Sequence, residues 1–245
     1  MPNLTQILLF IPIMLITLTV HEYMHGRVAY ALGDPTARSL GRLTLNPIKH
    51  IDPIGALCMI FLGFGWAKPV PVNSRYFKRP QRDMALVAIA GPISNLVLAL
   101  LGCLLFFTTV EVANALLTFG YFGFDGGIIY YSPNPFMTGT GLIAPDSIAF
   151  EAVKNLILFF YYFHFANITL AVFNLIPIPP LDGSRVLTQF LPPRLYWQLM
   201  QYEQYFGIAL MILVLLGSFT GVLSAVSGFI SDGMVGLIRL IPIFS

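Results

Sequence analysis

The chain has 245 residues, of which 57% are hydrophobic and 10% are charged, and its mean hydropathy is +0.79. Soluble domains carry about a quarter charged residues, so this composition excludes both an ordinary water-soluble enzyme and an intrinsically disordered chain. The formal net charge of +2 gives no indication of a nucleic-acid partner. Since no long polar stretch interrupts the sequence, we expect one membrane-embedded unit over 1–245, with its core in 4–191.

A helix that spans a membrane needs about 20 apolar residues. Four stretches meet this requirement: 4–32, 84–110, 152–176 and 203–223. The tail 224–244 is apolar but contains several glycines, and the sequence leaves open whether it forms a fifth span or an interfacial segment within the C-terminal helical region 203–245. We therefore expect an all-α polytopic membrane protein with about 4–6 transmembrane helices.

The distribution of charge predicts the orientation of these helices. Nine of the 13 basic residues lie between Arg27 and Arg82, whereas 111–151 contains four acidic residues and no basic one. By the positive-inside rule, 33–82 is a cytoplasmic loop and 111–151 an external loop. The cytoplasmic loop is expected to be β-rich and partly re-entrant. Alternating polar and apolar residues predict a short strand over Arg42–Leu45, and the run 54–67 is too short to cross the membrane.

The first predicted span contains ionisable residues, which are costly in a membrane and therefore indicate function. His21, Glu22 and His25 form an HExxH motif. Residues i and i+4 share one face of a helix, so the two imidazoles can bind one metal ion. Glu22 lies beside them and can accept a proton from a water molecule on that metal. Polar side chains that merely pack helices together are the alternative interpretation of the motif.

A catalytic zinc ion takes three protein ligands, so the two histidines leave one ligand to be found. Asp182 is the best candidate, because it follows the third span in a stretch that Pro177, Pro179 and Pro180 keep from being helical. Non-helical backbone at membrane depth is tolerated against protein or a watery cavity. The alternative for Asp182 is a cap on a helix that begins near Gly183.

Three other polar residues remain open on the sequence alone. Asn95, on the second span, either contacts the substrate or the oxyanion, or packs helices together. His50 lies in the basic loop, where we expect it to be solvated. His164 lies near the middle of the third span, where it lines a cavity or bonds to a neighbouring helix.

Four segments together resemble the site-2 protease family of intramembrane zinc metalloproteases. They are the HExxH motif at 21–25, Gly-Pro-Ile-Ser-Asn at 91–95, Asn-x-x-Pro-x-Pro-x-x-Asp-Gly at 174–183, and the loop 41–53 that follows the metal helix. HExxH alone is shared by many zinc enzymes, whereas its combination with the downstream Asp-Gly segment 177–191 is much more specific. The resemblance covers most of 15–190.

The resemblance implies zinc, one ion per chain, held by His21, His25 and Asp182, with Glu22 as general base and with Asn95 and Asn174 near the substrate or oxyanion. It further implies a bacterial inner-membrane protein. The depths of His21 and His25 in the first span and of Asn95 in the second, at about 1.5 Å per residue, lead us to expect the active site in the cytoplasmic half of the bilayer. The expected partners are a transmembrane protein substrate, lipid and a regulatory membrane protein, while the oligomeric state is left open. No PDZ or CBS domain is expected. The alternative function is a metal-ion transporter or channel that uses the same His and Asp cluster.

Overall fold

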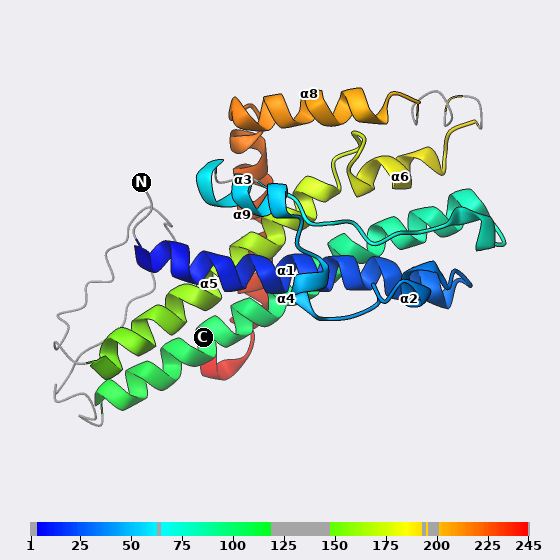
Figure 1. Cartoon of the computed structure of the whole chain (residues 1–245). Helices are drawn as coiled ribbons and strands as arrows, with labels where there is room; N and C mark the ends of the chain where they lie inside the picture. Colours follow the sequence, from blue (N-terminus) through cyan, green and yellow to red (C-terminus); the bar gives the residue numbers. More distant parts are fainter. Residues whose placement is uncertain (1–3, 63–64, 119–147, 193–194, 196–200, 245) are drawn as a thin grey trace.

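The computed structural model describes residues 4–62, 65–118, 148–192, 195 and 201–244. Helices make up nearly all of its regular structure (Figure 1). The longer ones are α1 (Leu4–Ala31), α3 (Pro53–Leu62), α4 (Pro80–Thr118), α5 (Ile148–Asn174), α8 (Glu203–Leu215) and α9 (Thr220–Ile238). Shorter helical segments are α2 (Thr36–Ser39), η1 (Pro47–Lys49), η2 (Ser74–Tyr76), α6 (Asp182–Thr188) and η3 (Pro242–Phe244).

Four helices in the described part of the chain are long and apolar enough to cross a membrane, which agrees with a multi-pass membrane protein. These spans are Leu8–Ala31, Pro80–Ala115, Glu151–Asn174 and Thr220–Ile238. The second helix is longer at both ends than the predicted 84–110. Most of the predicted external loop, 119–147, lies outside the described residues.

The predicted span 203–223 is wrong, because a turn at Gly217 divides it. Gly217 has a φ of +71°, a left-handed conformation that glycine adopts without strain. The helix before it, α8, has 13 residues, so it extends about 20 Å and is shorter than the hydrocarbon core of a bilayer. The fourth long helix is instead α9, in the tail that the sequence left undecided.

The predicted strand over Arg42–Leu45 is also wrong, since Leu43 and Thr44 form a bend and the residues on either side of them have no regular structure. In place of strand pairing, the Arg42 guanidinium donates to the Lys68 carbonyl at 2.8 Å, and the Asn46 side chain caps η1. Among the described residues, β pairing is limited to one bridge between Ile51 and Ala67. That bridge joins the two ends of a hairpin over 51–67, and α3 forms its first arm. The hairpin contains the run 54–67, which was predicted to be too short to cross the membrane.

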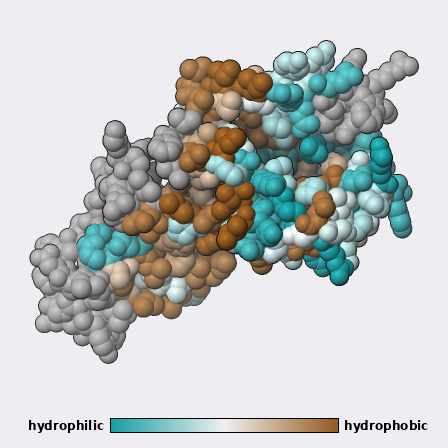
Figure 2. All heavy atoms as spheres, viewed as in Figure 1, coloured by the Kyte–Doolittle hydropathy of each residue, from teal (hydrophilic) through white to brown (hydrophobic). Residues whose placement is uncertain are grey.

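Helices α1, α4 and α5 pack against one another and form the frame of the molecule. Helix α9 packs across α5 and α4, where Ile238 joins a buried cluster with Phe106, Phe107 and Ile157. Hydrophilic side chains dominate the end of the molecule where α2 and the first turns of α4 lie, and hydrophobic ones cover the middle (Figure 2). The molecule therefore has one polar end and an apolar body.

Asp34 connects the end of α1 to the segment 65–73, which returns from the hairpin. Its side chain is completely buried, and its two oxygens accept hydrogen bonds from the backbone N–H groups of Thr36, at 2.9 Å, and Asn73, at 2.7 Å. A buried N–H that loses its acceptor keeps the full cost of its desolvation. Asp34 is therefore a structural link between two segments that are 39 residues apart.

We expect Asp34→Ala to lower the free energy of unfolding by about 2–4 kcal/mol, because two partly buried backbone donors lose a charged acceptor that is itself completely buried. Asp52→Ala is the matched control, since Asp52 also accepts from backbone N–H groups, of Ile54 and Gly55, but as a partly exposed cap on α3. Its loss should cost about 1 kcal/mol. Thermal unfolding in detergent checks both values, and equal shifts in the two variants would contradict the structural role of Asp34.

Candidate metal centre

Two histidines of α1 and one aspartate of α6 meet at a single point inside the helical frame. The Nε2 atoms of His21 and His25 lie 3.0 Å apart. The Oδ2 atom of Asp182 lies 3.2 Å from Nε2 of His21 and 3.3 Å from Nε2 of His25. These residues form the one group of at least three potential metal-ligating side chains found among the described residues. The structure thus brings together the three side chains that were predicted from the sequence, although 157 residues separate His25 from Asp182.

Asp182 reaches this point because α5 ends early and the chain turns back sharply. Helix α5 ends at Asn174, and α6 begins at Asp182 after a proline-rich turn. A Cβ atom on Gly183 would lie 2.2 Å from the carbonyl oxygen of Leu175, so only glycine allows the two segments to approach this closely. The N-cap of α6 is Leu181, and no side chain caps this helix. The capping alternative for Asp182 is therefore not what the structure shows.

The hydrogen bonds behind the two imidazoles determine which of their nitrogens carries a proton. His25 Nδ1 lies 2.8 Å from the carbonyl oxygen of Val87, and His21 Nδ1 lies 2.6 Å from Oδ1 of Asn95. Both oxygens can only accept, so both Nδ1 atoms must donate. In neutral imidazoles, the two Nε2 atoms then present lone pairs to each other and to Asp182. Three acceptor atoms converge with no hydrogen between them, and a cation satisfies all three.

The donor set and its spacing fit zinc. Zinc binds imidazole nitrogen and carboxylate oxygen at about 2.0–2.2 Å in tetrahedral sites, which places neighbouring ligand atoms about 3.3 Å apart. The observed separations of 3.0, 3.2 and 3.3 Å are close to that value. Oδ2 of Asp182 is buried and has no hydrogen-bond partner, as expected for an oxygen that serves as a metal ligand. Three protein ligands leave one coordination position for water or substrate.

Gly91 of α4 forms the wall against which the two imidazoles pack. A Cβ atom at this position would lie 2.6 Å from Cε1 of both His21 and His25. Such a distance is far below van der Waals contact, so a side chain here would displace the histidines. In the sequence Gly91 is the first residue of the Gly-Pro-Ile-Ser-Asn segment, and the structure shows that the two imidazoles occupy the space next to it.

Glu22 is partly buried and accepts a hydrogen bond of 2.7 Å from the backbone N–H of Val70. Val70 stands between Pro69 and Pro71, which have no N–H to offer. Within 69–71, the N–H of Val70 is therefore the backbone donor that can bond to Glu22. This contact fixes the Glu22 carboxylate relative to α1. It could not be predicted from the sequence, because it depends on how the hairpin folds back.

The two candidate asparagines have different surroundings. Asn95 is completely buried, and its amide is engaged by His21, by Asn167 and, at 3.4 Å, by the Thr17 carbonyl. Asn174 is partly buried at the end of α5, where its Nδ2 donates to the carbonyl of Leu170 at 3.0 Å. The structure therefore brings Asn95 to the histidines and leaves Asn174 with a hydrogen bond inside its own helix.

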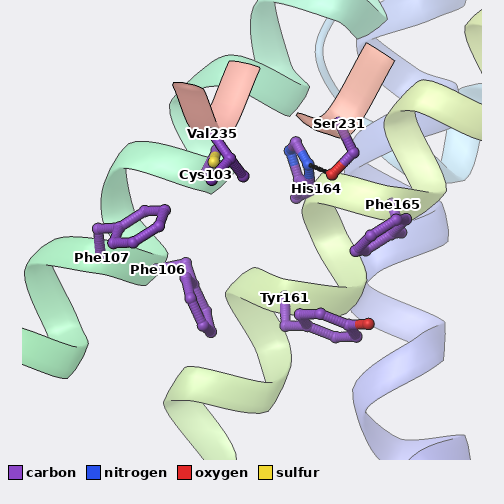
Figure 3. A pocket seen from close by; sticks show the side chains of 8 residues that line it. All are labelled: Cys103, Phe106, Phe107, Tyr161, His164, Phe165, Ser231 and Val235. Atoms are coloured by element: carbon purple, nitrogen blue, oxygen red, sulfur yellow. Dashed lines mark hydrogen bonds between the residues drawn. The ribbon is translucent and has the colours of Figure 1, made fainter. Parts of the chain in front are cut away.

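The other two histidines lie outside the cluster. His50 is 2% exposed and its Nε2 donates to the Thr44 carbonyl, so the expectation that it is solvated is wrong. It is buried because it closes the turn at 44–50. His164 joins three helices: Nδ1 donates to the carbonyl of Ala99 on α4, and Nε2 accepts from the hydroxyl of Ser231 on α9 (Figure 3). The predicted bond to a neighbouring helix is thus observed, and His164 also lines a small pocket together with Cys103, Phe106 and Tyr161 (Figure 3).

Comparison with known proteins assigns a class to this fold and site. The model of peptidase family M50 matches residues 9–217, so the chain belongs to this family. Membership of this family, together with the names of the relatives described next, implies that the metal is zinc and that the protein is a protease. No solved structure matches the chain.

Among similar proteins, "Putative zinc metalloprotease YwhC" of Bacillus subtilis (strain 168) is 39% identical over 208 residues, which cover 84% of this chain and 80% of that protein. "Putative zinc metalloprotease Rip2" of Mycolicibacterium smegmatis is 27% identical over 82% of this chain and 64% of its own length. Its namesake in Mycobacterium tuberculosis (strain H37Rv) is 26% identical over 84% of this chain and 66% of its own length.

We expect Gly91→Ala to weaken zinc binding by at least about 10-fold, because the added methyl group must push both imidazoles out of position. Gly228→Ala on α9 is the matched control, since a Cβ there meets nothing within 4 Å. It should bind zinc like the parent protein. Competition with a chromophoric chelator measures both affinities, and equal affinity in parent and Gly91→Ala would show that the imidazoles do not depend on this wall.

Proposed function

We propose that the protein is an intramembrane zinc metalloprotease of the site-2 type, with one zinc ion per chain, that hydrolyses peptide bonds within or near transmembrane segments of other proteins. The observation that carries this proposal is the convergence of His21, His25 and Asp182 on one point with three unprotonated ligand atoms. Membership of a metalloprotease family supports hydrolysis as the chemistry of that point.

The place of the cluster along α1 supports an intramembrane site. His25 and His21 lie 6 and 10 residues before the last residue of α1, Ala31, which corresponds to about 9 and 15 Å along the helix axis. Both therefore belong to the candidate span Leu8–Ala31. A peptide bond cleaved at this depth belongs to a segment that is itself in or near the membrane.

The charge distribution supports a site in the cytoplasmic half of the bilayer. The end of α1 that follows His21 and His25 lies at the polar end of the molecule (Figure 1). This end carries exposed basic residues such as Arg38, Arg79 and Arg82. Basic residues favour the cytoplasmic side. Together with the bacterial origin of the relatives, this supports a bacterial inner-membrane protein.

In the proposed reaction the residues of this chain have separate tasks. His21, His25 and Asp182 hold the zinc ion, which when bound lowers the pKa of water and polarises a carbonyl group. Glu22 accepts the proton of the attacking water and returns it to the leaving amine. The Val70 N–H keeps its carboxylate oriented. Asn174 remains a candidate for contact with the substrate or the oxyanion.

The substrate must meet one physical condition. A transmembrane helix has its carbonyl groups engaged in internal hydrogen bonds, so it must unwind locally before a peptide bond can be attacked. We propose that the partners are a transmembrane protein and a regulatory membrane protein, with lipid around the helices and no role for nucleic acid. A metal-ion transporter is not favoured, because the family and its named relatives are metalloproteases.

We expect Glu22→Gln to lower the cleavage rate by about 10²–10⁴-fold while one zinc ion per chain is retained, because the amide cannot accept the proton of water. Cleavage of candidate single-span membrane proteins in vesicles, together with metal analysis of the purified protein, measures both properties.

Asp182→Asn is the matched comparison, since it is also a change from carboxylate to amide but removes a metal ligand. It should lose zinc as well as cleavage. Cleavage by Glu22→Gln at the parental rate would remove Glu22 as the base. Zinc-dependent ion flux across vesicles without cleavage would contradict the proposed activity and favour transport.

A further inference from the structure

His21 is held from behind by a chain of hydrogen bonds that passes through three helices. Its Nδ1 bonds to Asn95 Oδ1 on α4, and Asn95 Nδ2 donates to Asn167 Oδ1 on α5 at 2.9 Å. Asn167 Nδ2 donates to Thr17 Oγ1 on α1 at 3.0 Å and to the carbonyl oxygen of Phe163 at 2.8 Å. The side chains of Asn95, Asn167 and Thr17 are all completely buried. Such a network is costly unless every member is bonded, so its geometry is specific.

The network has a direction that is set at its far end. The backbone carbonyl of Phe163 can only accept, so the NH₂ group of Asn167 must face it. The oxygen of Asn167 then faces Asn95, which must present its own NH₂ group in reply. The oxygen of Asn95 is left for His21, whose Nδ1 must therefore carry the proton. Reversing either amide would bring two acceptors or two donors together in a buried site.

We propose that Asn95 and Asn167 are positioning residues that select the Nδ1-protonated tautomer of His21 and thereby present its Nε2 lone pair to the metal. This inference rests on the proposed function for the identity of the metal. The two amides act through the imidazole and touch neither zinc nor substrate. Asn95 thus has a role that could not be predicted from its sequence motif. Asn167 is a residue of the site that the sequence analysis did not identify.

The two zinc-binding histidines are oriented in different ways, which makes the proposal testable. His25 donates to the backbone carbonyl of Val87, an acceptor that substitution of the Val87 side chain does not remove. His21 depends on two side chains in series. Changing Asn167 should therefore affect His21 and spare the tautomer of His25.

The first test compares zinc affinity in Asn167→Leu and Ile168→Ala. Leucine has the same branched outline and number of side-chain heavy atoms as asparagine but no amide, so Asn95 is free to turn its NH₂ group towards His21 and favour the wrong tautomer. We expect zinc to bind about 10–100-fold more weakly to Asn167→Leu. Ile168 is also completely buried and adjacent on α5, but it has no polar atom in its side chain. Ile168→Ala should lose packing and keep the parental zinc affinity.

The second test is independent of zinc and of cleavage. Nitrogen-15 NMR of the metal-free protein with labelled histidine, at alkaline pH where the imidazoles are neutral, reports which nitrogen carries the proton. We expect the Nδ1–H form for His21 in the parent and in Ile168→Ala, and a mixture containing the Nε2–H form in Asn167→Leu. If Asn167→Leu does not fold, Asn167→Ala removes the same amide with a smaller side chain, and the mixture containing the Nε2–H form is then expected in Asn167→Ala.

An Nε2–H tautomer of His21 in the parent would overturn the inference, and so would equal zinc affinity in Asn167→Leu and Ile168→Ala. Failure of the proposed function has a different signature, because a parent protein that holds no zinc can still show the expected tautomer. The two accounts are therefore separated by the same set of samples.

Discussion

The structure depends on three acceptor atoms that face one another inside a bundle of apolar helices. Two imidazole nitrogens and a carboxylate oxygen lie within 3.0–3.3 Å, while the protons that could separate them are engaged on the opposite edges of the rings. Without a cation this arrangement is repulsive, and burial prevents water from relieving it fully. Metal binding is therefore coupled to the folding of this region, because the ion stabilises the only state in which the three atoms meet.

The rest of the helical frame allows these three ligand atoms to come together. Gly91 and Gly183 remove the side chains that would obstruct it, one against the imidazoles and one against the end of α5. Behind the ligands, contacts from α4 and α5 orient the rings. In front of them, the segment 65–73 is tied to α1 by Asp34 and by Glu22. A backbone donor thus holds the candidate base, and the same loop that supplies it is anchored one turn beyond the helix end.

The sequence predicted the parts of the site that follow from local spacing. HExxH on a helix places two imidazoles on one face, and three prolines before Asp182 exclude a helix there, so their convergence could be anticipated. Their role as zinc ligands stays a prediction, as does that of Glu22 as a base. The contacts of Asn95 with His21 and Asn167 could not be anticipated, because they depend on the relative rotation of three helices. The one available signal was that an asparagine in an apolar span needs a partner.

Two features of the fold were predicted wrongly for physical reasons. An alternating pattern over Arg42–Leu45 predicted a strand, but a strand requires a neighbour to pair with. Side-chain contacts to the Lys68 carbonyl and around Asn46 stabilise an irregular segment with a bend instead. A continuous apolar run over 203–223 predicted a span, but hydropathy does not register that Gly217 reverses the chain at low cost. In both places local backbone chemistry outweighed a pattern of hydrophobicity.

X-ray absorption at the zinc edge of the purified protein in lipid tests the central claim most directly. The account predicts a first shell of nitrogen and oxygen at about 2.0–2.2 Å, with the outer scattering of two imidazole rings in the parent and of one in His21→Ala. A shell containing sulfur, or a zinc signal that is the same in the parent and in His21→Ala, would contradict it.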